Sequence, residues 1–548
     1  MRHGHQFATA THASPLVWRH RPITGAAAGS QIRVRGAPDA PLLLGVDVGT
    51  TNVKAALYDL RGNVQVASSQ RLPVDHPRPG WSQYDPDALF DATAAVMRHV
   101  LTQRGSAPVA GVAVASMAET AVPLSGAGEA LHPAIAWHDE RTRPQADWWR
   151  RHVGADAVYQ RTGLPIVPIF GIHKLMWLRE HKPEVYARTR VWLNVADYVA
   201  YRLCGVQATD VSLASRLMVL DLTERRWSDD LLSACGVDRS ILPEVVQSGQ
   251  RLGGVHAAGE AATGVPAGTP VAAGGHDHVC GALALGLTEP GDVLDSMGTA
   301  ESLLTVVERP HLTVAMARGG YQQGAHVVPD RTYCNAGLYT SGACVEWLRS
   351  LFIPDEPDPY GVLERWASTS PVGSHGVFFL PHLRLPSPPV VALSARAAFV
   401  GLRASTERGD MARALLEGLA FEAHASLEGL VERMDLTLRH VRAIGGGTRN
   451  RTLMRIKAAL LGHPLEVALH DEATTLGAAL LAGVGAGLFR DATDAAARVT
   501  FTYDTVEVDD GWRAAYLRAY RSVYQALYPA LVDLHHRIDA LEDSSHVQ

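Results

Sequence analysis

Two segments of the chain share one pattern of apolar and polar positions. In each, an apolar run is followed by a short turn of small residues and then by a second apolar run. The first segment spans residues 42–59 and turns at Gly49-Thr50-Thr51-Asn52, and the second spans 291–306 and turns at Gly298-Thr299-Ala300. This pattern is typical of a β-hairpin. Its recurrence predicts two related lobes.

Between and after these hairpins, short apolar runs alternate with segments of helical periodicity. We expect further strands at 63–72, 109–116, 134–137, 271–273, 441–444 and 465–467. We expect helices at 86–101, 174–180, 195–203, 280–287, 411–430, 453–461, 475–487 and 512–527. The helix at 475–487 is rich in alanine and glycine, which suits close packing on a neighbour. Strands that alternate with helices indicate an α/β fold.

Turn and composition signals divide the chain. Glu289-Pro290-Gly291 is a turn pattern and marks the boundary between the lobes. Residues 1–40 contain no acid before Asp39, but they lack both a steady helical stripe and a secretory apolar core. A disordered extension, or an upstream start codon, therefore explains them better than a transit peptide. The expected organisation is a disordered N-terminal extension (1–40), an N-terminal lobe (41–289), a C-terminal lobe (290–535) and a flexible tail (536–548).

Composition excludes several classes of protein. The chain of 548 residues has a net charge of −6, so it offers no electrostatic case for binding nucleic acid. No apolar run reaches the length of a membrane span, so we expect no membrane partner. The five cysteines form no CxxC pair, which is typical of reduced thiols in the cytoplasm. The expected partner is a small molecule, and a homodimer is the one assembly considered for the chain itself.

The first hairpin carries the clearest candidate chemistry. Asp47 stands at the end of its first strand, the turn supplies hydroxyl and backbone N–H groups, and Lys54 lies just beyond. Such a turn can wrap a phosphate, and an aspartate beside it can hold Mg²⁺ directly or through water. Two hairpins of this kind suggest that the lobes share one nucleotide.

An ordered series of motifs runs through most of the chain. After the first turn come Gly-Trp-Ser-Gln-Tyr-Asp-Pro (80–86), Trp-His-Asp-Glu-Arg (137–141), Lys-Leu-Met-Trp (174–177), Gly-His-Asp (275–277), Ser-Met-Gly-Thr (296–299), Leu-Leu-Glu-Gly (415–418), Gly-Gly-Gly-Thr (445–448) and Thr-Leu-Gly-Ala-Ala (475–479). Each motif alone is weak, but in this order they resemble the FGGY carbohydrate kinase family over about residues 42–530. The resemblance implies two actin-like, ribonuclease-H-like ATPase lobes with a cleft between them.

The resemblance also implies a role for individual residues. Asp277 matches the family's general base, which accepts the proton of the attacking hydroxyl. Asp47 matches the carboxylate that accompanies Mg²⁺, and ATP is the phosphoryl donor. The residues expected to bind ATP and its phosphates are Thr50, Thr51, Asn52, Lys54, Gly298, Thr299, Gly446, Gly447 and Asn450. The residues expected to bind the sugar are Trp81, Ala118, Glu119, Asp277 and His278.

Several of these residues have simpler explanations. Asp277 could be the N-cap of a helix that begins at His278, and Lys54 could be a solvated strand residue. His276 and His278 occupy alternate positions and could ligate a metal, but no third ligand stands at a suitable spacing. His278 is the more natural contact for a sugar hydroxyl.

The residues after the strand at 109–116 decide the substrate. Xylulokinases tend to carry Gln-Met-His-Gly here and glycerol kinases Gln-Arg-Glu-Thr, whereas this chain has Ser116-Met117-Ala118-Glu119-Thr120. Glu119 can accept hydrogen bonds from two sugar hydroxyls, and Ala118 opens the volume that an arginine would fill. Ile169 stands where glycerol kinases carry an aromatic residue, so glycerol is not the expected substrate.

The sequence therefore predicts an ATP-dependent kinase that phosphorylates a primary hydroxyl of a small sugar, ketose or polyol. A xylulose-like pentulose is favoured, and tetritols, pentitols and gluconate-like acids are the alternatives. A non-enzymatic ATP-driven protein of the same superfamily would lack the Gly-Asp base and the Gly-Trp-Ser motif. A non-catalytic sugar sensor is disfavoured because Asp47, Asp277 and Thr299 are all present.

Overall fold

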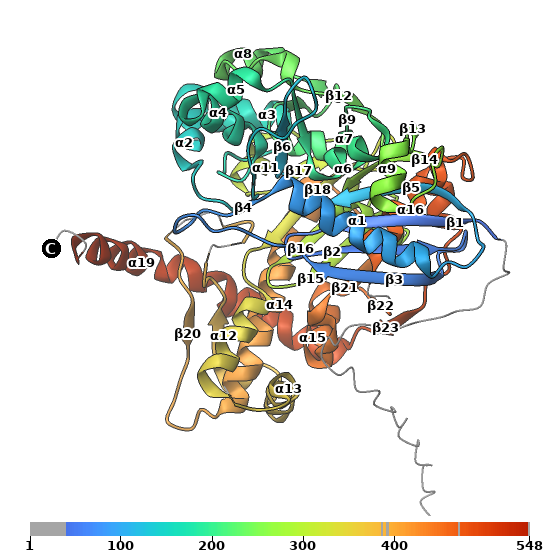
Figure 1. Ribbon diagram of the computed structural model, residues 1–548. Coiled ribbons are helices and arrows are strands. Elements are labelled where there is room, and N and C mark those ends of the chain that lie inside the picture. The colour runs from blue at the N-terminus through green and yellow to red at the C-terminus, as the bar shows by residue number, and fades with distance from the viewer. Residues whose placement is uncertain (1–39, 354, 385–386, 391–393, 470–471, 546–548) are drawn as a thin grey trace, which may run out of the picture.

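Two β-sheets form the frame of the molecule. The computed structural model describes residues 40–545 apart from 354, 385–386, 391–393 and 470–471 (Figure 1). The extension expected at residues 1–40 thus lies outside the described residues, except for its last residue. The first sheet comes from the N-terminal half of the chain and the second from the C-terminal half.

The first sheet has six strands in the order β13-β14-β5-β1-β2-β3. The first three strands in the chain form an antiparallel meander, and β5 and β14 run parallel to β1. Leu44, Val46 and Val112 are fully buried, because helices cover the sheet on both faces. The strands are β1 (Leu42–Val48), β2 (Asn52–Tyr58), β3 (Val64–Arg71), β5 (Val109–Ser116), β13 (Arg251–Gly254) and β14 (Pro270–His276).

The second sheet repeats this plan. Its order is β17-β18-β16-β15-β21-β22-β23, with β15, β16 and β18 as the antiparallel meander and β21 and β22 parallel to β15. Apart from the edge strands β13, β17 and β23, both sheets therefore have a three-stranded antiparallel meander followed by two strands parallel to its first strand, β3-β2-β1-β5-β14 and β18-β16-β15-β21-β22, which confirms the predicted repeat. The strands are β15 (Val293–Met297), β16 (Glu301–Val307), β17 (Gln322–Ala325), β18 (Thr332–Leu338), β21 (Val441–Ile444), β22 (Leu465–Ala468) and β23 (Tyr503–Val506).

Two helices connect the sheets, because each follows a strand of one sheet and packs on the other. Helix α10 (Asp277–Ala284) follows the last strand of the first sheet but contacts β15 and β16 of the second. Helix α16 (Ala473–Gly485) follows β22 but packs on β1, β5 and β14 of the first sheet. The helices also pack on each other, and a Cβ on Gly477 would come within 1.9 Å of the Cys280 carbonyl oxygen. This close contact explains the alanine and glycine content of the segment.

Other helices cover the outer faces. Helix α1 packs on β2 and β3, and its N-cap Asp85 accepts from the N–H groups of Asp87 and Ala88, with Pro86 as the first helical residue. The longer helices are α1 (Pro86–Thr102), α2 (Arg143–His152), α3 (Ala155–Thr162), α4 (Gly171–His181), α5 (Pro183–Arg188), α6 (Val195–Cys204), α8 (Asp229–Cys235), α9 (Ala257–Thr263), α11 (Val314–Arg318), α12 (Gly342–Phe352), α13 (Pro359–Thr369), α14 (Arg408–Met434), α15 (Arg451–Leu461) and α17 (Ala492–Ala497). Short elements complete the described residues: β4 (Gln83–Tyr84), β6 (Ala121–Leu124), β7 (Ala134–Ile135), β8 (Val191–Asn194), β9 (Ala208–Asp210), α7 (Val211–Ala214), η1 (Ser215–Leu217), β10 (Leu220–Asp221), β11 (Arg226–Trp227), η2 (Arg239–Ile241), β12 (Glu244–Val246), η3 (Ser374–Gly376), β19 (Phe378–Leu380), β20 (Ala398–Val400) and η4 (Gly446–Arg449).

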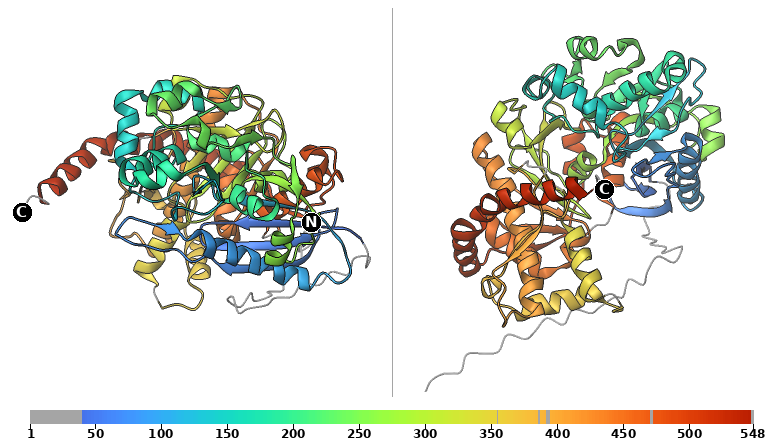
Figure 2. Two further views of the ribbon diagram at one scale, coloured as in Figure 1. Left: turned by 45° about the horizontal axis from the view of Figure 1, so that its top comes forward. Right: turned by 90° about the vertical axis from the view of Figure 1, so that its left-hand side faces the viewer.

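The C-terminal segment is helical further than expected. Helix α18 (Asp510–Ala519) continues through a π-helical turn (Tyr520–Tyr524) into α19 (Gln525–Ser545). Figures 1 and 2 show α19 extending away from the rest of the molecule. The tail expected from residue 536 is helical as far as Ser545, because Leu534, Ile538 and Leu541 continue the helical apolar spacing. Residues 546–548 lie outside the described residues.

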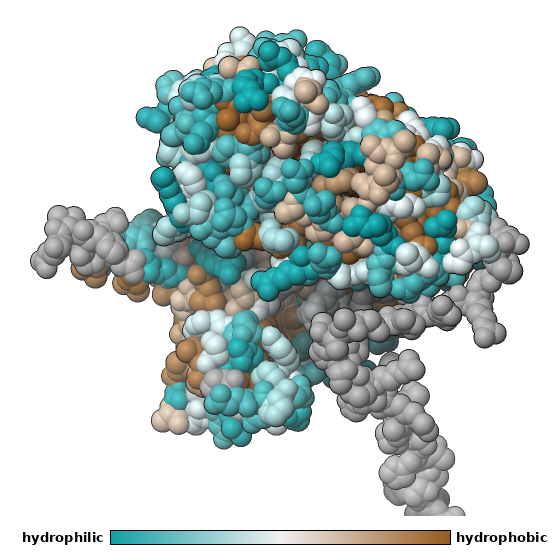
Figure 3. Space-filling view, viewed as in Figure 1, coloured by the Kyte–Doolittle hydropathy of each residue, from teal (hydrophilic) through white to brown (hydrophobic). Residues whose placement is uncertain are grey.

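The surface is mostly hydrophilic in the upper part of the face shown in Figure 3, with apolar residues scattered among the hydrophilic ones. Across the described residues, no helix combines the length and the apolar composition needed to cross a bilayer. All five cysteines are free thiols, and four of them are buried.

Candidate active site

Three parallel strands of the first sheet end together at one edge. Val48 of β1 lies opposite Ser116 of β5, and Ser116 lies opposite His276 of β14. Parallel strands present their carboxyl ends at the same edge of a sheet, so the segments that follow them start side by side. The residues brought together in this way are Asp47, Thr50, Ala118, Glu119 and Asp277.

The second sheet gathers its loops in the same manner. Ser296 of β15 lies opposite Ile444 of β21, so the loop with Gly298 and Thr299 starts beside the glycine run. A Cβ on Gly447 would come within 2.8 Å of the Met297 Cβ atom, so this glycine is needed for the two loops to pack.

Gly446 differs from the neighbouring glycine. A Cβ at this position would meet no atom within 4 Å, so its surface is open and leaves room for a ligand. Asn450, also expected at the nucleotide, is the N-cap of α15, and its side chain accepts from the N–H group of Leu453 at 2.9 Å. The amide of Asn450 thus has a structural use in addition to any contact with a nucleotide.

Asp277 stands at the start of α10. It is the first helical residue and His276 is the N-cap, so the helix begins one residue earlier than the N-cap explanation of Asp277 requires. Its Oδ1 atom accepts from the N–H group of His278 at 2.6 Å and lies 3.2 Å from Nε2 of His276. Both contacts use one carboxylate oxygen, and a quarter of the side chain surface is exposed. The carboxylate is therefore oriented by its neighbours and still accessible.

The carboxylate of Asp47 is confined. Its Oδ1 atom is buried without a hydrogen-bond partner among the described residues. Burial, reinforced by the negative charge of Asp277, raises the pKa of Asp47 to about 8, although Lys54 opposes the shift. A buried carboxylate that lacks a partner suits a bound cation, so Asp47 fits an Mg²⁺ ion. No group of three His, Cys, Asp or Glu side chains among the described residues is arranged to hold a metal, so substrate phosphates and water would complete such a site.

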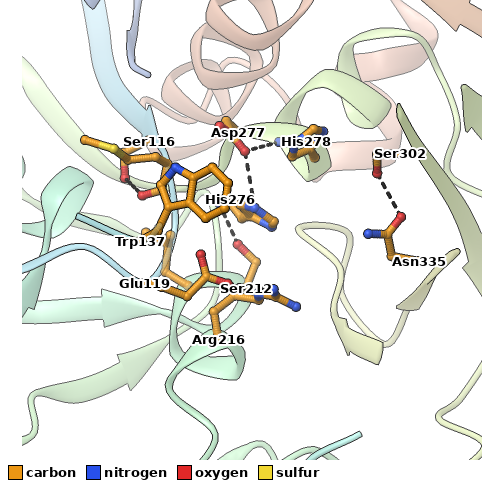
Figure 4. A network of polar contacts seen from close by, with 12 residues as sticks. Ser116, Glu119, Trp137, Ser212, Arg216, His276, Asp277, His278, Ser302 and Asn335 are labelled. Atoms are coloured by element: carbon orange, nitrogen blue, oxygen red, sulfur yellow. Dashed lines mark hydrogen bonds and ion pairs between the residues drawn. The ribbon is translucent and has the colours of Figure 1, made fainter. Parts of the chain in front are cut away.

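Two aromatic residues hold the first turn. Trp137 Nε1 donates to Thr50 Oγ1 at 2.9 Å, and the Tyr84 hydroxyl donates to the Thr50 carbonyl oxygen at 3.0 Å. Thr51 and Asn52 are exposed at the tip, as phosphate ligands must be. Figure 4 draws Trp137 in the same close-up as Asp277.

Lys54 is not a solvated strand residue. Its Nζ atom lies 3.0 Å from both carboxylate oxygens of Glu472, which precedes α16. Tyr58 donates to the Glu472 carbonyl oxygen at 3.3 Å and shares a 2.6 Å hydrogen bond with Thr475 Oγ1. In this conformation Lys54 links β2 to the helix from the other half of the chain.

The second turn rests on a buried ionic cluster. Lys457 Nζ donates to Glu301 Oε1 at 2.7 Å and to a carboxylate oxygen of Asp295, directly beneath the turn. Gly298 and Thr299 are exposed, and the carbonyl oxygen of Thr299 accepts from the N–H groups of two residues at the start of α12. The turn is therefore fixed from below and from one side, and the Gly298 N–H closes it by donating to the Ala300 carbonyl oxygen at 2.8 Å.

Two of the residues expected at the sugar have other neighbours. Trp81 packs edge-on against Trp177 at 5.6 Å between ring centroids, and the guanidinium of Arg141 lies 3.9 Å from its ring centre. Ala118 is buried in the apolar core of the first lobe. His278 is exposed next to Asp277, with its ring 5.6 Å from that of His276.

Glu119 is not the free acceptor that the sequence suggests. Its Oε1 atom accepts from Arg216 Nε at 2.6 Å, and both side chains are less than a tenth exposed. Its backbone has a φ of 61°, in the left-handed region, and its carbonyl oxygen accepts from Lys174 Nζ at 2.6 Å. Burial lowers the pKa of Lys174 to about 7. We expected the Glu119 carboxylate to accept hydrogen bonds from sugar hydroxyls only. In the structure one of its oxygens already accepts from Arg216.

Three residues of the site were not foreseen as contributors. Trp137 belongs to a motif that we identified, but no role was assigned to it. Arg216 and Glu472 lie 97 and 418 positions from the residues that they pair with, Glu119 and Lys54. No short-range pattern could connect such distant positions.

Comparison with known proteins places this geometry in one family. The family model described as the FGGY family of carbohydrate kinases matches residues 42–284 with its N-terminal domain and 294–486 with its C-terminal domain. A glycerol kinase of Gloeobacter violaceus is 32% identical over 89% of this chain and 97% of its own length. A xylulose kinase of Staphylococcus xylosus is 27% identical over 87% of this chain and 95% of its own. The crystal structure of xylulose kinase from Rhodospirillum rubrum superposes with a TM-score of 0.84 at 28% identity, over 90% of this chain and all of that one. The resemblance and the two-lobed fold expected from the motifs are therefore confirmed, and the chain belongs to the FGGY family of carbohydrate kinases.

Proposed function

We infer that this carbohydrate kinase transfers the γ-phosphoryl group of ATP to a primary hydroxyl of a small sugar, with Asp277 as the general base. The observation that carries the assignment is the position of Asp277. It lies at the edge where β1, β5 and β14 end, with one oxygen held by its neighbours and part of its surface exposed. A carboxylate in this position can accept the proton of the attacking hydroxyl as the new bond forms.

The remaining parts of the site supply charge compensation and positioning. The exposed turns with Thr50 and Thr299 offer N–H and hydroxyl groups to the phosphates, and the open surface at Gly446 suits the nucleoside. Asp47 would hold Mg²⁺, which neutralises charge on the phosphates when it is bound. Phosphoryl transfer depends mainly on such positioning and electrostatic stabilisation.

A xylulose-like pentulose is the favoured substrate. The xylulose kinases among the relatives support this choice, and their sequences cover nearly the same length. A glycerol kinase also matches, but glycerol kinases tend to place an arginine where this chain has the buried Ala118. Tetritols, pentitols and sugar acids are the alternatives. We expect the enzyme to act in the cytoplasm, as a monomer or homodimer.

A coupled assay of ADP release tests both the activity and the base. The wild-type protein should turn over at least one sugar in a panel of ketoses, polyols and sugar acids, with glycerol among the poor substrates. Asp277→Asn should retain ATP affinity but lose roughly 10²–10⁴ in kcat, the usual contribution of a positioned base. Asp229→Asn is the matched control, because Asp229 is the exposed first residue of a distant helix, α8.

Each alternative leads to a different result. Sugar binding measured by calorimetry without any ADP release would indicate a sensor. Wild-type turnover by Asp277→Asn, with the chemical step limiting, would remove Asp277 from the role of base.

A further inference from the structure

The ion pair of Glu119 and Arg216 has no use in the mechanism described so far. Glu119 follows β5, and Arg216 comes from the 3₁₀ turn η1, which belongs to a different part of the first lobe. Arg216 Nη2 also donates to Gln322 Oε1 at 3.1 Å, so the guanidinium reaches the edge strand β17 of the second sheet. Its planar group lies 5.1 Å from the ring centre of Phe170.

The segment that carries Arg216 contacts the segment that carries the candidate base. The Ser212 hydroxyl accepts from the backbone N–H of His276 at 2.9 Å, and Figure 4 draws these residues in one close-up with Glu119, Arg216 and Asp277. The His276 ring, 3.2 Å from Asp277 Oδ1, is close enough to Arg216 to be affected by its charge. Burial, with smaller contributions from His278 and Arg216, holds the pKa of His276 well below its usual range, so this imidazole is neutral at physiological pH.

Stability alone does not explain why the pair is retained. Removing two charges from water is costly, and well-packed apolar residues of similar volume often stabilise a protein as well as a buried ion pair does. The backbone of Glu119 is in addition held in a left-handed conformation by Lys174. Such an arrangement is better explained by a function at the neighbouring site, since strained, paired groups cluster at binding sites.

The charge balance of the pair has a direct consequence for binding. The positive charge of Arg216 is compensated by Glu119, and Asp277 adds a negative charge nearby. A substrate carboxylate placed here would face two carboxylates and a cation that is already paired, which is unfavourable at low local dielectric. Neutral hydroxyl groups, by contrast, can donate to Glu119 and accept from Arg216.

We propose that Glu119 and Arg216 together select neutral polyhydroxy substrates, ketoses or polyols, and reject sugar acids. This inference rests on the proposed function and narrows its substrate class. Glycerol kinases tend to carry an arginine at the position of Ala118, directly before the glutamate. In this chain Arg216, from a distant segment, places a cation next to Glu119 instead. The selection is made by the pair, because Glu119 alone would leave the pocket strongly negative and Arg216 alone would attract a carboxylate.

Xylitol and D-xylonate test the proposal, since they have the same carbon chain and differ in charge at one end. The wild-type kcat/KM for xylitol or D-xylulose should exceed that for D-xylonate by at least about 100-fold. Glu119→Gln leaves the cation of Arg216 without its counter-charge, so the ratio of xylonate to xylitol activity should rise at least about tenfold. Arg161→Met is the control, because Arg161 is about half exposed and forms an ion pair with Asp221.

A double variant keeps the test valid if Glu119→Gln folds poorly. Glu119→Gln combined with Arg216→Met removes both charges and should fold, but it should lose about 10- to 100-fold in kcat/KM for the neutral substrate and gain no activity on xylonate. Unchanged neutral-substrate kinetics in the folded double variant would overturn the proposal. A wild-type preference for xylonate would overturn the proposal alone, whereas turnover of neither class would overturn the proposed kinase activity and the proposal with it.

Discussion

At the scale of single residues, Asp47 carries the most informative electrostatics. Its Oδ1 atom is buried and unpartnered, and burial with the nearby charge of Asp277 raises its pKa to about 8. The ionised form is therefore disfavoured until a cation arrives. Lys54, opposite Asp47 in the β1–β2 ladder, does not serve as that cation, because its ammonium group pairs with Glu472.

Replacing Asp47 by asparagine should change stability and catalysis in opposite directions. The folded pKa of about 8 lies above the ordinary aspartate pKa of 3.8, so the folded state binds more protons between these pH values and stability falls as pH rises through this window. Without Mg²⁺, Asp47→Asn should be more stable than wild type at pH 9, and the difference should vanish near pH 4. Turnover with MgATP should fall by roughly 10²–10³-fold, as for the loss of a preorganised electrostatic group.

Thermal unfolding from pH 4 to 9 in EDTA measures the effect on stability, and steady-state turnover with MgATP measures the effect on catalysis. MgATP should raise the melting temperature of wild type more than that of Asp47→Asn. Asp75→Asn, which alters an exposed carboxylate of the same lobe, should show neither change. If the melting temperatures of wild type and Asp47→Asn depend on pH in the same way, Asp47 does not have a raised pKa in the folded protein.

The same scale shows how far the sequence predicts the site. Asp47, Asp277 and the two turns can be found because each stands at the end of an apolar run, where parallel strands deliver their side chains. The partner of Glu119 cannot be found in this way. Arg216 reaches Glu119 only through the tertiary packing of η1, which contacts α4, α7, β10 and β17, and no local pattern encodes that contact.

At the scale of elements, the crossing of α10 and α16 positions Asp277, the proposed base. Asp277 begins α10, and α10 lies against α16 at a contact with no room for a Cβ on Gly477. The sequence predicted both helices and the close packing of the second, because alanine and glycine repeat along it. The sequence predicted that α10 begins at residue 280, whereas it begins at Asp277. The polar run His276-Asp277-His278 does not continue the apolar periodicity, so the first turn of the helix cannot be identified from the pattern.

Gly477→Ala should therefore act on the active site through the helix pair. The added methyl group would displace α10, which should cost roughly 1–3 kcal/mol of stability. A displacement of Asp277 by about 1 Å should lower kcat by about 10²-fold. Urea unfolding and steady-state kinetics measure the two effects.

Gly281→Ala provides the matched control on the other helix. A Cβ at Gly281 would lie 3.8 Å from its nearest neighbour, Thr474 Oγ1, so it fits without movement. This variant should keep its activity and gain roughly 0.5–1 kcal/mol, the usual difference between alanine and glycine inside a helix. Similar behaviour of the two variants would mean that the crossing does not position Asp277.

At the scale of the whole molecule, the candidate site residues are divided between the two sheets. The turn with Thr50 and the proposed base lie on the first sheet, whereas the turn with Thr299 and the glycine run lie on the second. The hairpin repeat in the sequence predicted this division, because each hairpin begins a sheet of the same strand order. The C-terminal helix was predicted less well, since its apolar spacing continues past the expected boundary.

A nucleotide whose phosphates contact both turns must bring the sheets together, so sugar and nucleotide should bind cooperatively. Calorimetry with a non-hydrolysable ATP analogue should show affinity rising about 5- to 150-fold when the sugar is present, the usual range of coupling between sites. Thr299→Val removes a hydroxyl from the second turn, so it should weaken nucleotide binding and reduce the coupling, but it should leave sugar binding in the absence of nucleotide unchanged. Thr369→Val, on the exposed face of α13, should match wild type in all three measurements. Full coupling in Thr299→Val would place the phosphates on the first turn alone, and the two sheets would then have to close for a reason other than a shared nucleotide.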